Sequence, residues 1–223
     1  MNQTIVNSSG NVNTQAYWDG RFGTGDWERR GGLNQSRAFS ISQLPHLNID
    51  ASFDGALVDF GCGAGDAMPV YRRAFPRASL TGVDFSSRAV ELGRRRFGQI
   101  AAFVQGDYSD VPKCDVIICS NVMEHLDDDR AAASELIKRC HRLLIVVPFE
   151  EREPLCDEHV RSYRLQSFND FNVVRTAVFP SRGWSEYGFR DRLLGLHVGN
   201  LFRRLGGHPA HARKMQILFE ILP

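Results

Sequence analysis

Short apolar runs alternate with longer amphipathic stretches through the middle of the chain. The apolar runs have the length of strands and fall at residues 56–60, 79–84, 101–105, 115–120 and 142–147. Stretches with polar and apolar positions at helical spacing separate most of them. Alternation of strands and helices predicts parallel pairing, because a helical crossover returns the chain to the same edge of the sheet. We therefore expect an α/β fold with a doubly wound, mostly parallel sheet and helices on both faces.

Four helices are expected around this sheet, at 33–47, at 66–75, at 86–97, and after the acidic run 127–129 as far as residue 140. Ser86 begins the third helix and can accept a hydrogen bond from a free N–H group of its first turn. The acids at 127–129 complement the positive end of the fourth helix dipole. Both features support a helical interpretation of the stretch that follows them.

The alternation stops after the fifth strand, which Pro148 is expected to close. The rest of the chain is predicted to contain a short helix and two strands, at 162–171, 173–179 and 215–222. The segment 181–213 separates these two strands and is expected to be a helical insertion, with one helix at 187–205. That helix is apolar with arginines at both ends. Three roles remain open for this helix: packing on the domain, dimerisation, and peripheral contact with a membrane surface.

Composition indicates one globular domain. The chain has 223 residues, of which 43% are hydrophobic, and its net charge is +1. Such a length supports one sizeable domain, and the near-neutral charge argues against nucleic acid as the main partner. Residues 1–13 are rich in Asn, Ser and Gly and are expected to be disordered. Residues 14–223 are then the single domain, with cap helices within 14–50.

The cysteines and the apolar runs bear on location. Five cysteines form no C-x-x-C pair, which is typical of a reducing compartment rather than a disulfide scaffold. The polar N-terminus does not have the apolar core of a signal peptide, and the apolar runs are too short to span a membrane. We expect a cytoplasmic monomer or homodimer without a transmembrane segment.

A glycine-rich turn follows the first predicted strand. The turn is Gly61-Cys62-Gly63-Ala64-Gly65, with Asp59 before it and Asp66 after it, and the second strand ends at Asp84. Glycines let the backbone approach a ligand, and an acid after the next strand can accept hydrogen bonds from ribose hydroxyls. The spacing differs from the G-x-G-x-x-G of dinucleotide sites. Two acids beside the turn favour a cationic ligand over a pyrophosphate, so an adenosine cofactor with a positive charge is expected.

Four blocks then give the chain a family resemblance. They are 58–65, 82–86, 105–108 and 114–126, in this order. Together they resemble the motifs of Rossmann-like class I S-adenosylmethionine-dependent methyltransferases, of the type that acts on small molecules. The resemblance implies a seven-stranded sheet that ends in an antiparallel hairpin, and it implies S-adenosylmethionine as the cofactor.

The resemblance also implies a set of cofactor contacts. Asp59 would reach the methionyl ammonium, and the backbone at Gly61, Cys62, Gly63 and Gly65 would approach the ligand. Asp84 would bind the ribose hydroxyls, Phe85 would lie against the adenine edge, and Asp107 would accept from the adenine amino group with Tyr108 nearby. Ser120 and Asn121 would border the methionyl part. Tyr17 and Arg21 belong to an aromatic and basic segment that would close over the cofactor, or that would pin the N-terminus to the core.

Catalytic residues are harder to predict, because methyl transfer depends mainly on alignment and a general base only assists. His125, His159 and Glu124 are the candidates. His159 is preferred, because its loop follows the fifth strand and ligands bind at the carboxyl ends of parallel strands. A structural role for His125 is equally open. The spacing of His, Cys and acidic residues predicts no metal site. The resemblance leaves a metal open, since some relatives with Glu-His after the fourth strand use magnesium.

The acceptor is expected to be a small or medium molecule, such as a sugar, a lipid or a secondary metabolite, methylated on oxygen or nitrogen. Ser120-Asn121-Val122-Met123 stands where amino-methylating enzymes of nucleic acids carry Asn/Asp-Pro-Pro-Tyr. Two alternatives remain at this point. One is an NAD-type oxidoreductase, and the other is a non-catalytic methyltransferase-like binding subunit.

Overall fold

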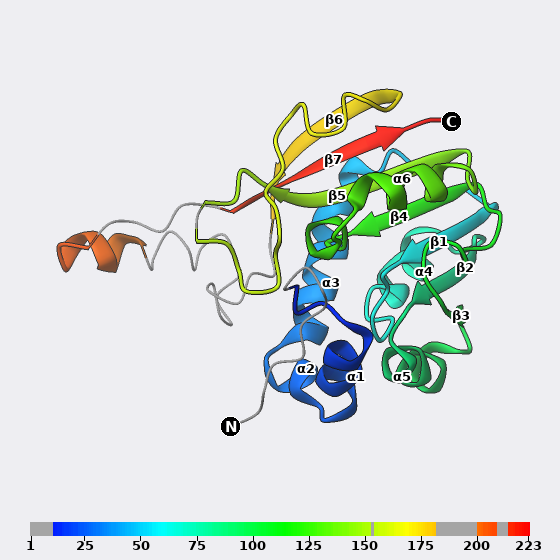
Figure 1. Ribbon diagram of the computed structural model, residues 1–223, viewed down its shortest axis with the longest axis horizontal. Coiled ribbons are helices and arrows are strands. Elements are labelled where there is room, and N and C mark those ends of the chain that lie inside the picture. Colours follow the sequence, from blue (N-terminus) through cyan, green and yellow to red (C-terminus); the bar gives the residue numbers. More distant parts are fainter. Residues whose placement is uncertain (1–10, 153, 182–199, 209–213) are drawn as a thin grey trace.

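One sheet runs through the molecule, with helices on both sides (Figure 1). The computed structural model describes residues 11–152, 154–181, 200–208 and 214–223. Within these ranges seven strands pair in the order β3-β2-β1-β4-β5-β7-β6. The strands are β1 Ala56–Phe60, β2 Ser79–Asp84, β3 Ala102–Gln105, β4 Val116–Ser120, β5 Arg142–Phe149, β6 Val173–Pro180 and β7 Met215–Ile221. Only β7 runs antiparallel to its neighbours, so the predicted fold class is confirmed.

Apart from the helical residues 200–205, eight helical segments surround the sheet in the described residues. They are α1 Gln15–Gly23, α2 Asp26–Arg29, α3 Gly32–Gln43, α4 Met68–Ala74, α5 Ser87–Phe97 and α6 Asp129–Ile137, with 3-10 turns η1 Leu44–His46 and η2 Met123–His125. Ser86 caps α5 by accepting from the Ala89 N–H, and Asp128 caps α6 by accepting from Ala131. The predicted starts of these two helices are therefore correct to within a residue or two.

The central strands β1, β4 and β5 are buried on both faces, as parallel strands covered by helices must be. Val58, Ile117 and Leu143 face α6 in one core layer. The alternate positions of the same strands point to a second layer, which packs on α4, α5 and η1. This double burial explains why the strands are apolar without interruption rather than alternating.

Two predictions in the last third of the chain are wrong. Residues 162–171 form turns and not a helix, because Tyr163 and Phe168 are drawn into the core and stack on each other with ring centroids 5.6 Å apart. Pro148 does not close β5, which pairs with β7 as far as Phe149. β4 has already ended at this level, so the proline faces a strand on one side only and needs no second hydrogen bond.

Of the expected disordered start, residues 1–10 lie outside the described residues, and only 11–13 can be compared. Asn11 is 7% exposed, and its amide donates to the His125 carbonyl oxygen at 2.8 Å. Residues 11–13 are therefore packed against the domain. Residues 187–199 of the expected helix lie outside the described residues. The remaining residues, 200–205, are helical. No helix in the described ranges is long and apolar enough to cross a bilayer.

Glu220 on β7 links the side chains of the two neighbouring strands, β5 and β6, and its contribution to stability can be measured. Its carboxylate accepts hydrogen bonds at 2.8 Å from Arg142 of β5 and from Arg175 of β6, and its side chain is only 9% exposed. Glu220→Ala should lower the free energy of unfolding by about 2 kcal/mol, because it leaves two partly buried guanidinium groups without their acceptor. Glu135→Ala, which removes a surface pair with Lys138, should change it by less than about 1 kcal/mol in the same denaturant titration.

Candidate active site

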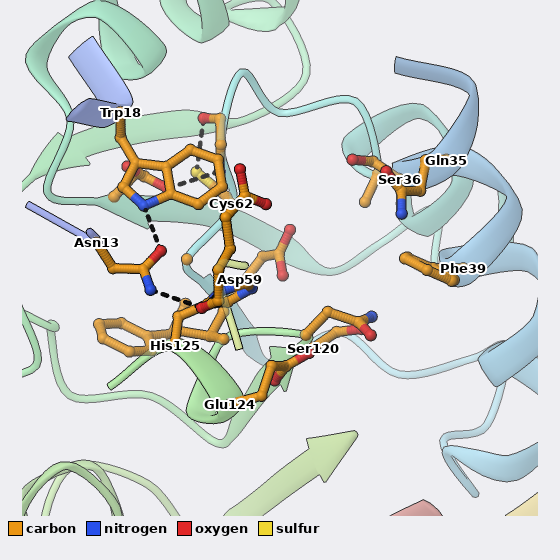
Figure 2. A pocket seen from close by; sticks show the side chains of 18 of the residues that line it. Asn13, Trp18, Gln35, Ser36, Phe39, Asp59, Cys62, Ser120, Glu124 and His125 are labelled. Carbon is orange, nitrogen blue, oxygen red and sulfur yellow. Dashed lines mark hydrogen bonds between the residues drawn. The ribbon is translucent and has the colours of Figure 1, made fainter. Parts of the chain in front are cut away.

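A cavity of about 350 Å³ opens at the carboxyl ends of β1, β2 and β4. Its walls come from the glycine turn, from the N-terminal helices and from the loop after β5. Figure 2 shows Trp18, Asn13 and His125 on one side of the pocket and Gln35, Ser36 and Phe39 of α3 on the other. Asp59 and Cys62 lie between these two sides. The position is the one at which doubly wound sheets bind ligands.

The glycine turn has a left-handed backbone. Gly61, Gly63 and Gly65 have φ angles of 73°, 53° and 77°. The N–H groups of Gly61 and Cys62 both donate to the Val83 carbonyl oxygen, at 2.8 and 3.1 Å. These bonds tie the turn to the end of β2 and leave the Gly61–Gly63 backbone as part of the cavity wall.

Gly65 has a different role from the one the sequence implied. It does not line the cavity, and a Cβ on it would lie 2.6 Å from the Phe103 ring. Phe103 belongs to β3 and is buried. Gly65 is therefore needed for packing of the turn on the sheet, and a ligand contact from it is not supported.

Asp84 holds the turn in place. Its two carboxylate oxygens accept from the N–H groups of Gly63, at 2.8 Å, and Ser86, at 2.9 Å. Burial raises the pKa of Asp84 to about 6, although these two backbone hydrogen bonds oppose the rise. Asp84 also lines the cavity, so it can present its remaining lone pairs to a ribose while it fixes the turn.

Asp59 is a buried acid at the centre of the pocket. It is 5% exposed, and burial together with the charge of Asp84 raises its pKa to about 8. A carboxyl group in this state gains most from a positively charged neighbour, because a cation removes the cost of ionising it. The position suits a methionyl ammonium.

A chain of amide and hydroxyl groups borders the pocket, and no local motif predicts it. Ser120 donates to the Gln43 side-chain oxygen at 2.9 Å, and Gln43 donates to the Tyr71 hydroxyl at 2.5 Å. Asn121 donates to Ser120 at 3.0 Å and accepts from Gln216 of β7 at 2.9 Å. The chain joins α3, α4, β4 and β7, and it fixes the orientation of Ser120 and Asn121 at the cavity wall.

Phe85, Asp107 and Tyr108, for which the resemblance implies contacts with the adenine, also line the cavity. Phe85 is 36% exposed, so its ring is available to a planar ligand. Trp18, which belongs to the aromatic and basic segment expected to close over the cofactor, also lines the cavity, and so does Trp27, which was not predicted. The Trp18 indole donates to the Asn13 side-chain oxygen at 3.1 Å, which orients the ring over the pocket.

Tyr17 and Arg21 do not line the cavity. Both donate to the same carboxylate oxygen of Glu158, in the loop after β5, and Arg21 also donates to the Tyr17 hydroxyl at 2.9 Å. Tyr17 and Arg21 therefore connect α1 to the loop after β5. Their effect on a cofactor would be indirect, through closure of the pocket.

Glu158→Gln should loosen this connection. The substitution keeps the shape of the side chain and removes its charge, and one charge-assisted hydrogen bond contributes about 2 kcal/mol. We expect limited proteolysis within α1 to accelerate and the affinity for S-adenosylhomocysteine to fall about tenfold. Glu91→Gln, on the exposed face of α5 beside Arg88, is the matched control and should change neither quantity.

The three catalytic candidates meet at one wall of the cavity. Glu124 and His125 lie in η2, and His159 reaches them from the loop after β5, with the two imidazole centroids 4.9 Å apart. Burial, and then the charge of His159, lower the pKa of His125 to about 4. Burial lowers the pKa of His159 as well, but a hydrogen bond from its Nδ1 to Glu151 and the charges of Glu151 and Glu124 outweigh it and raise the pKa. His159 is thus the stronger base of the pair.

The sheet order, the turn and the acids at the ends of β1 and β2 are typical of class I S-adenosylmethionine-dependent methyltransferases. Residues 58–145 match the family model described as Methyltransferase domain. This part of the chain is a methyltransferase domain of that class, and the alternative of a nicotinamide-dependent oxidoreductase is set aside.

Comparisons with known proteins agree with this assignment. Over 95 residues the chain is 30% identical to the ubiquinone/menaquinone biosynthesis C-methyltransferase UbiE of Desulfotalea psychrophila. That match covers 40% of this chain and 37% of the relative, so it spans little more than a third of that protein.

Two solved structures show the same fold at low identity. A chain in the complex of the Haloferax volcanii Trm112 methyltransferase activator with a methyltransferase has a TM-score of 0.64 at 16% identity, covering 92% of this chain and 97% of that one. The plantazolicin methyltransferase BpumL, in complex with a pentazolic substrate analogue and S-adenosylhomocysteine, has a TM-score of 0.54 at 16% identity, covering 94% and 95%. At these identities the likeness is one of fold.

Proposed function

We propose that this chain transfers the methyl group of S-adenosylmethionine to an oxygen or nitrogen atom of a small or medium acceptor. The observation that carries the proposal is one cavity with two different ends. The glycine turn, Asp59, Asp84 and Phe85 form an end suited to the cofactor. Glu124, His125, His159 and Glu151 form a polar end suited to an acceptor.

The residues present fit the cofactor. A Cβ at Gly61 or Gly63 would meet the side chains of Val122 or Phe22, so the backbone lies open to a ligand only because both are glycine. Asp59 would hold the ammonium, Asp84 the ribose hydroxyls, and Asp107 with Phe85 the adenine. Bound there, S-adenosylmethionine supplies a methyl carbon activated by its sulfonium.

Catalysis then requires that the reactants are aligned and that the acceptor loses one proton. In-line displacement needs the acceptor atom, the methyl carbon and the sulfur on one axis, in a site from which water is excluded. α1–α3 cover the pocket and provide the exclusion. His159, oriented by Glu151 at 2.5 Å, would accept the proton that an acceptor hydroxyl or ammonium loses.

Polar side chains at the acceptor end favour oxygen or nitrogen over carbon, and sugars, lipids and secondary metabolites remain the proposed acceptor classes. The curated relative is named a C-methyltransferase, so product analysis must determine which atom is methylated. Fold similarity to a chain of the Trm112 complex gives no reason at 16% identity to assign that partner here.

Ligand binding tests the proposal first. Titration calorimetry with S-adenosylhomocysteine should give one site per chain, whereas NAD should not bind. Formation of S-adenosylhomocysteine from S-adenosylmethionine should then be followed across a panel of hydroxylated and amino acceptors, with mass spectrometry of the products. Failure to bind S-adenosylmethionine at millimolar concentration would support the non-catalytic alternative instead.

A further inference from the structure

Three potential metal ligands converge at the acceptor end of the pocket. Glu124, His125 and His159 each offer a ligand atom, and these atoms lie within 4.8 Å of one another. Two of the residues are neighbours in η2, and the third comes from the loop after β5. All three line the cavity, so an ion held between them would be open to a ligand in the pocket. The spacing of these residues in the sequence does not predict the arrangement, because His159 comes from the loop after β5 and the other two ligands come from η2.

Glu124 is the first independent sign of a cation-binding site. Its side chain is completely buried, and neither of its carboxylate oxygens receives a hydrogen bond from another residue in the described part of the chain. A buried carboxylate is costly unless it is paired or coordinates a metal. The two imidazoles beside it are the nearest functional groups that can share a positive ligand with it.

The histidine hydrogen bonds are the second sign. Nδ1 of His125 lies 2.9 Å from the Glu158 carbonyl oxygen, and Nδ1 of His159 lies 2.5 Å from Glu151 Oε2. An acceptor opposite each Nδ1 makes that nitrogen the donor, which leaves the Nε2 lone pair of each ring for a ligand. Metal-binding histidines are held in the same way, by a carbonyl or carboxylate behind the ring.

We propose that Glu124, His125 and His159 bind one divalent transition-metal ion at the acceptor end of the pocket. Two imidazoles with one carboxylate suit Zn²⁺ or Fe²⁺, and they leave coordination positions open for other ligands. Mg²⁺ prefers an oxygen-rich site and is expected to bind weakly. Glu151 and the Glu158 carbonyl group are positioning groups behind the two rings.

The role of this ion rests on the proposed methyl transfer. An acceptor hydroxyl bound to the ion would lose its proton more readily, because a divalent cation stabilises the oxyanion. With the ion bound, the Nε2 lone pair of His159 is occupied and His159 no longer acts as the base, so the proton passes to solvent. The oxyanion forms the new O–C bond, and the C–S bond of the sulfonium breaks to leave neutral S-adenosylhomocysteine. The site therefore selects acceptors with a hydroxyl or another group that can bind a metal.

Metal binding can be measured without any acceptor. The full-length protein, stripped with a chelator, is titrated calorimetrically with Zn²⁺, with Mg²⁺ and, as a spectroscopic probe, with Co²⁺. We expect one Zn²⁺ per chain at micromolar affinity or tighter, little heat with Mg²⁺, and visible absorption bands from Co²⁺. Glu124→Gln and His159→Ala should weaken Zn²⁺ binding at least a hundredfold, and Glu151→Gln should weaken it about tenfold through the orientation of His159.

The matched control is His141→Ala, since His141 is 81% exposed and far from the cavity lining; its Zn²⁺ affinity should equal that of the wild type. Circular dichroism and binding of S-adenosylhomocysteine show whether each variant is folded. Unchanged Zn²⁺ affinity in folded Glu124→Gln and His159→Ala, or no Zn²⁺ binding by the wild type, overturns the proposal. If the wild type bound Zn²⁺ but not S-adenosylhomocysteine, the proposed function would be overturned and the metal site would still be supported.

Discussion

Gly61→Ala is expected to abolish detectable binding of S-adenosylhomocysteine. Gly61 has a φ angle of 73°, a conformation that costs an L-residue about 1–2 kcal/mol. A Cβ there would lie 2.2 Å from Val122 Cγ2, so the turn must move away from β4. Since the Gly61 N–H also donates to Val83, the displacement would break the link to the end of β2. Calorimetry should show at least a hundredfold loss of affinity, and the thermal midpoint should fall.

Gly20→Ala is the control for this substitution. Gly20 lies inside α1, and a Cβ on it would meet no atom within 4 Å. Alanine stabilises a helix interior by about 1 kcal/mol relative to glycine, so the thermal midpoint should stay the same or rise while ligand affinity is unchanged. Equal ligand affinity in the two variants would contradict the role assigned to the glycine turn.

Asp59→Asn is expected to uncouple stability from ligand binding. The ordinary pKa of an aspartate is 3.8, and in the folded protein the pKa of Asp59 is raised to about 8. Between these two values the folded state holds a proton that the unfolded state releases, so wild-type stability falls as the pH rises from about 4 to 8. Asparagine does not titrate. The variant should therefore be about as stable as the wild type near pH 4 and increasingly more stable as the pH rises to 8, as measured by chemical denaturation without ligand.

Ligand binding by the same variant should change in the opposite sense. Without the carboxylate, affinity for S-adenosylhomocysteine should fall at least a hundredfold, because the ammonium loses its buried counter-charge. In the wild type, affinity should rise from pH 6 to pH 8, and binding should release a proton, visible as a dependence of the calorimetric enthalpy on the buffer. Asp54→Asn makes the same chemical change at an exposed position and should alter none of these measurements. A pH-independent affinity in the wild type would show that Asp59 does not titrate on binding.

Local signals account for what the sequence predicted well. The apolar strands, the caps at Ser86 and Asp128, and the glycine turn are decided by residues close together in the chain, and each was found within a residue or two. The same holds for Asp59 and Asp84, because an acid at the end of a strand is placed by the strand itself. Class, sheet and cofactor could therefore be inferred from a few short segments.

The predictions that failed depended on distant contacts. The spacing of apolar residues in 162–171 is typical of a helix. The segment forms turns instead, because Tyr163 and Phe168 are both buried in the core. Two roles were open for Tyr17 and Arg21, closing over the cofactor or pinning the N-terminus, and both residues bind Glu158 of the loop after β5. Neither outcome can be read from the segment alone, since the partner belongs to another part of the chain.

The glycine turn, the acids that flank it and the alternation of strands and helices were determined by the sequence alone, because backbone conformation and strand burial follow from neighbouring residues. Only the tertiary structure decided that Gly65 packs on Phe103 and that Gln43 supports Ser120. It also brought Glu124, His125 and His159 to one wall of the pocket. These relations depend on the order of strands in the sheet and on the path of the loop after β5, which place residues far apart in the chain within bonding distance.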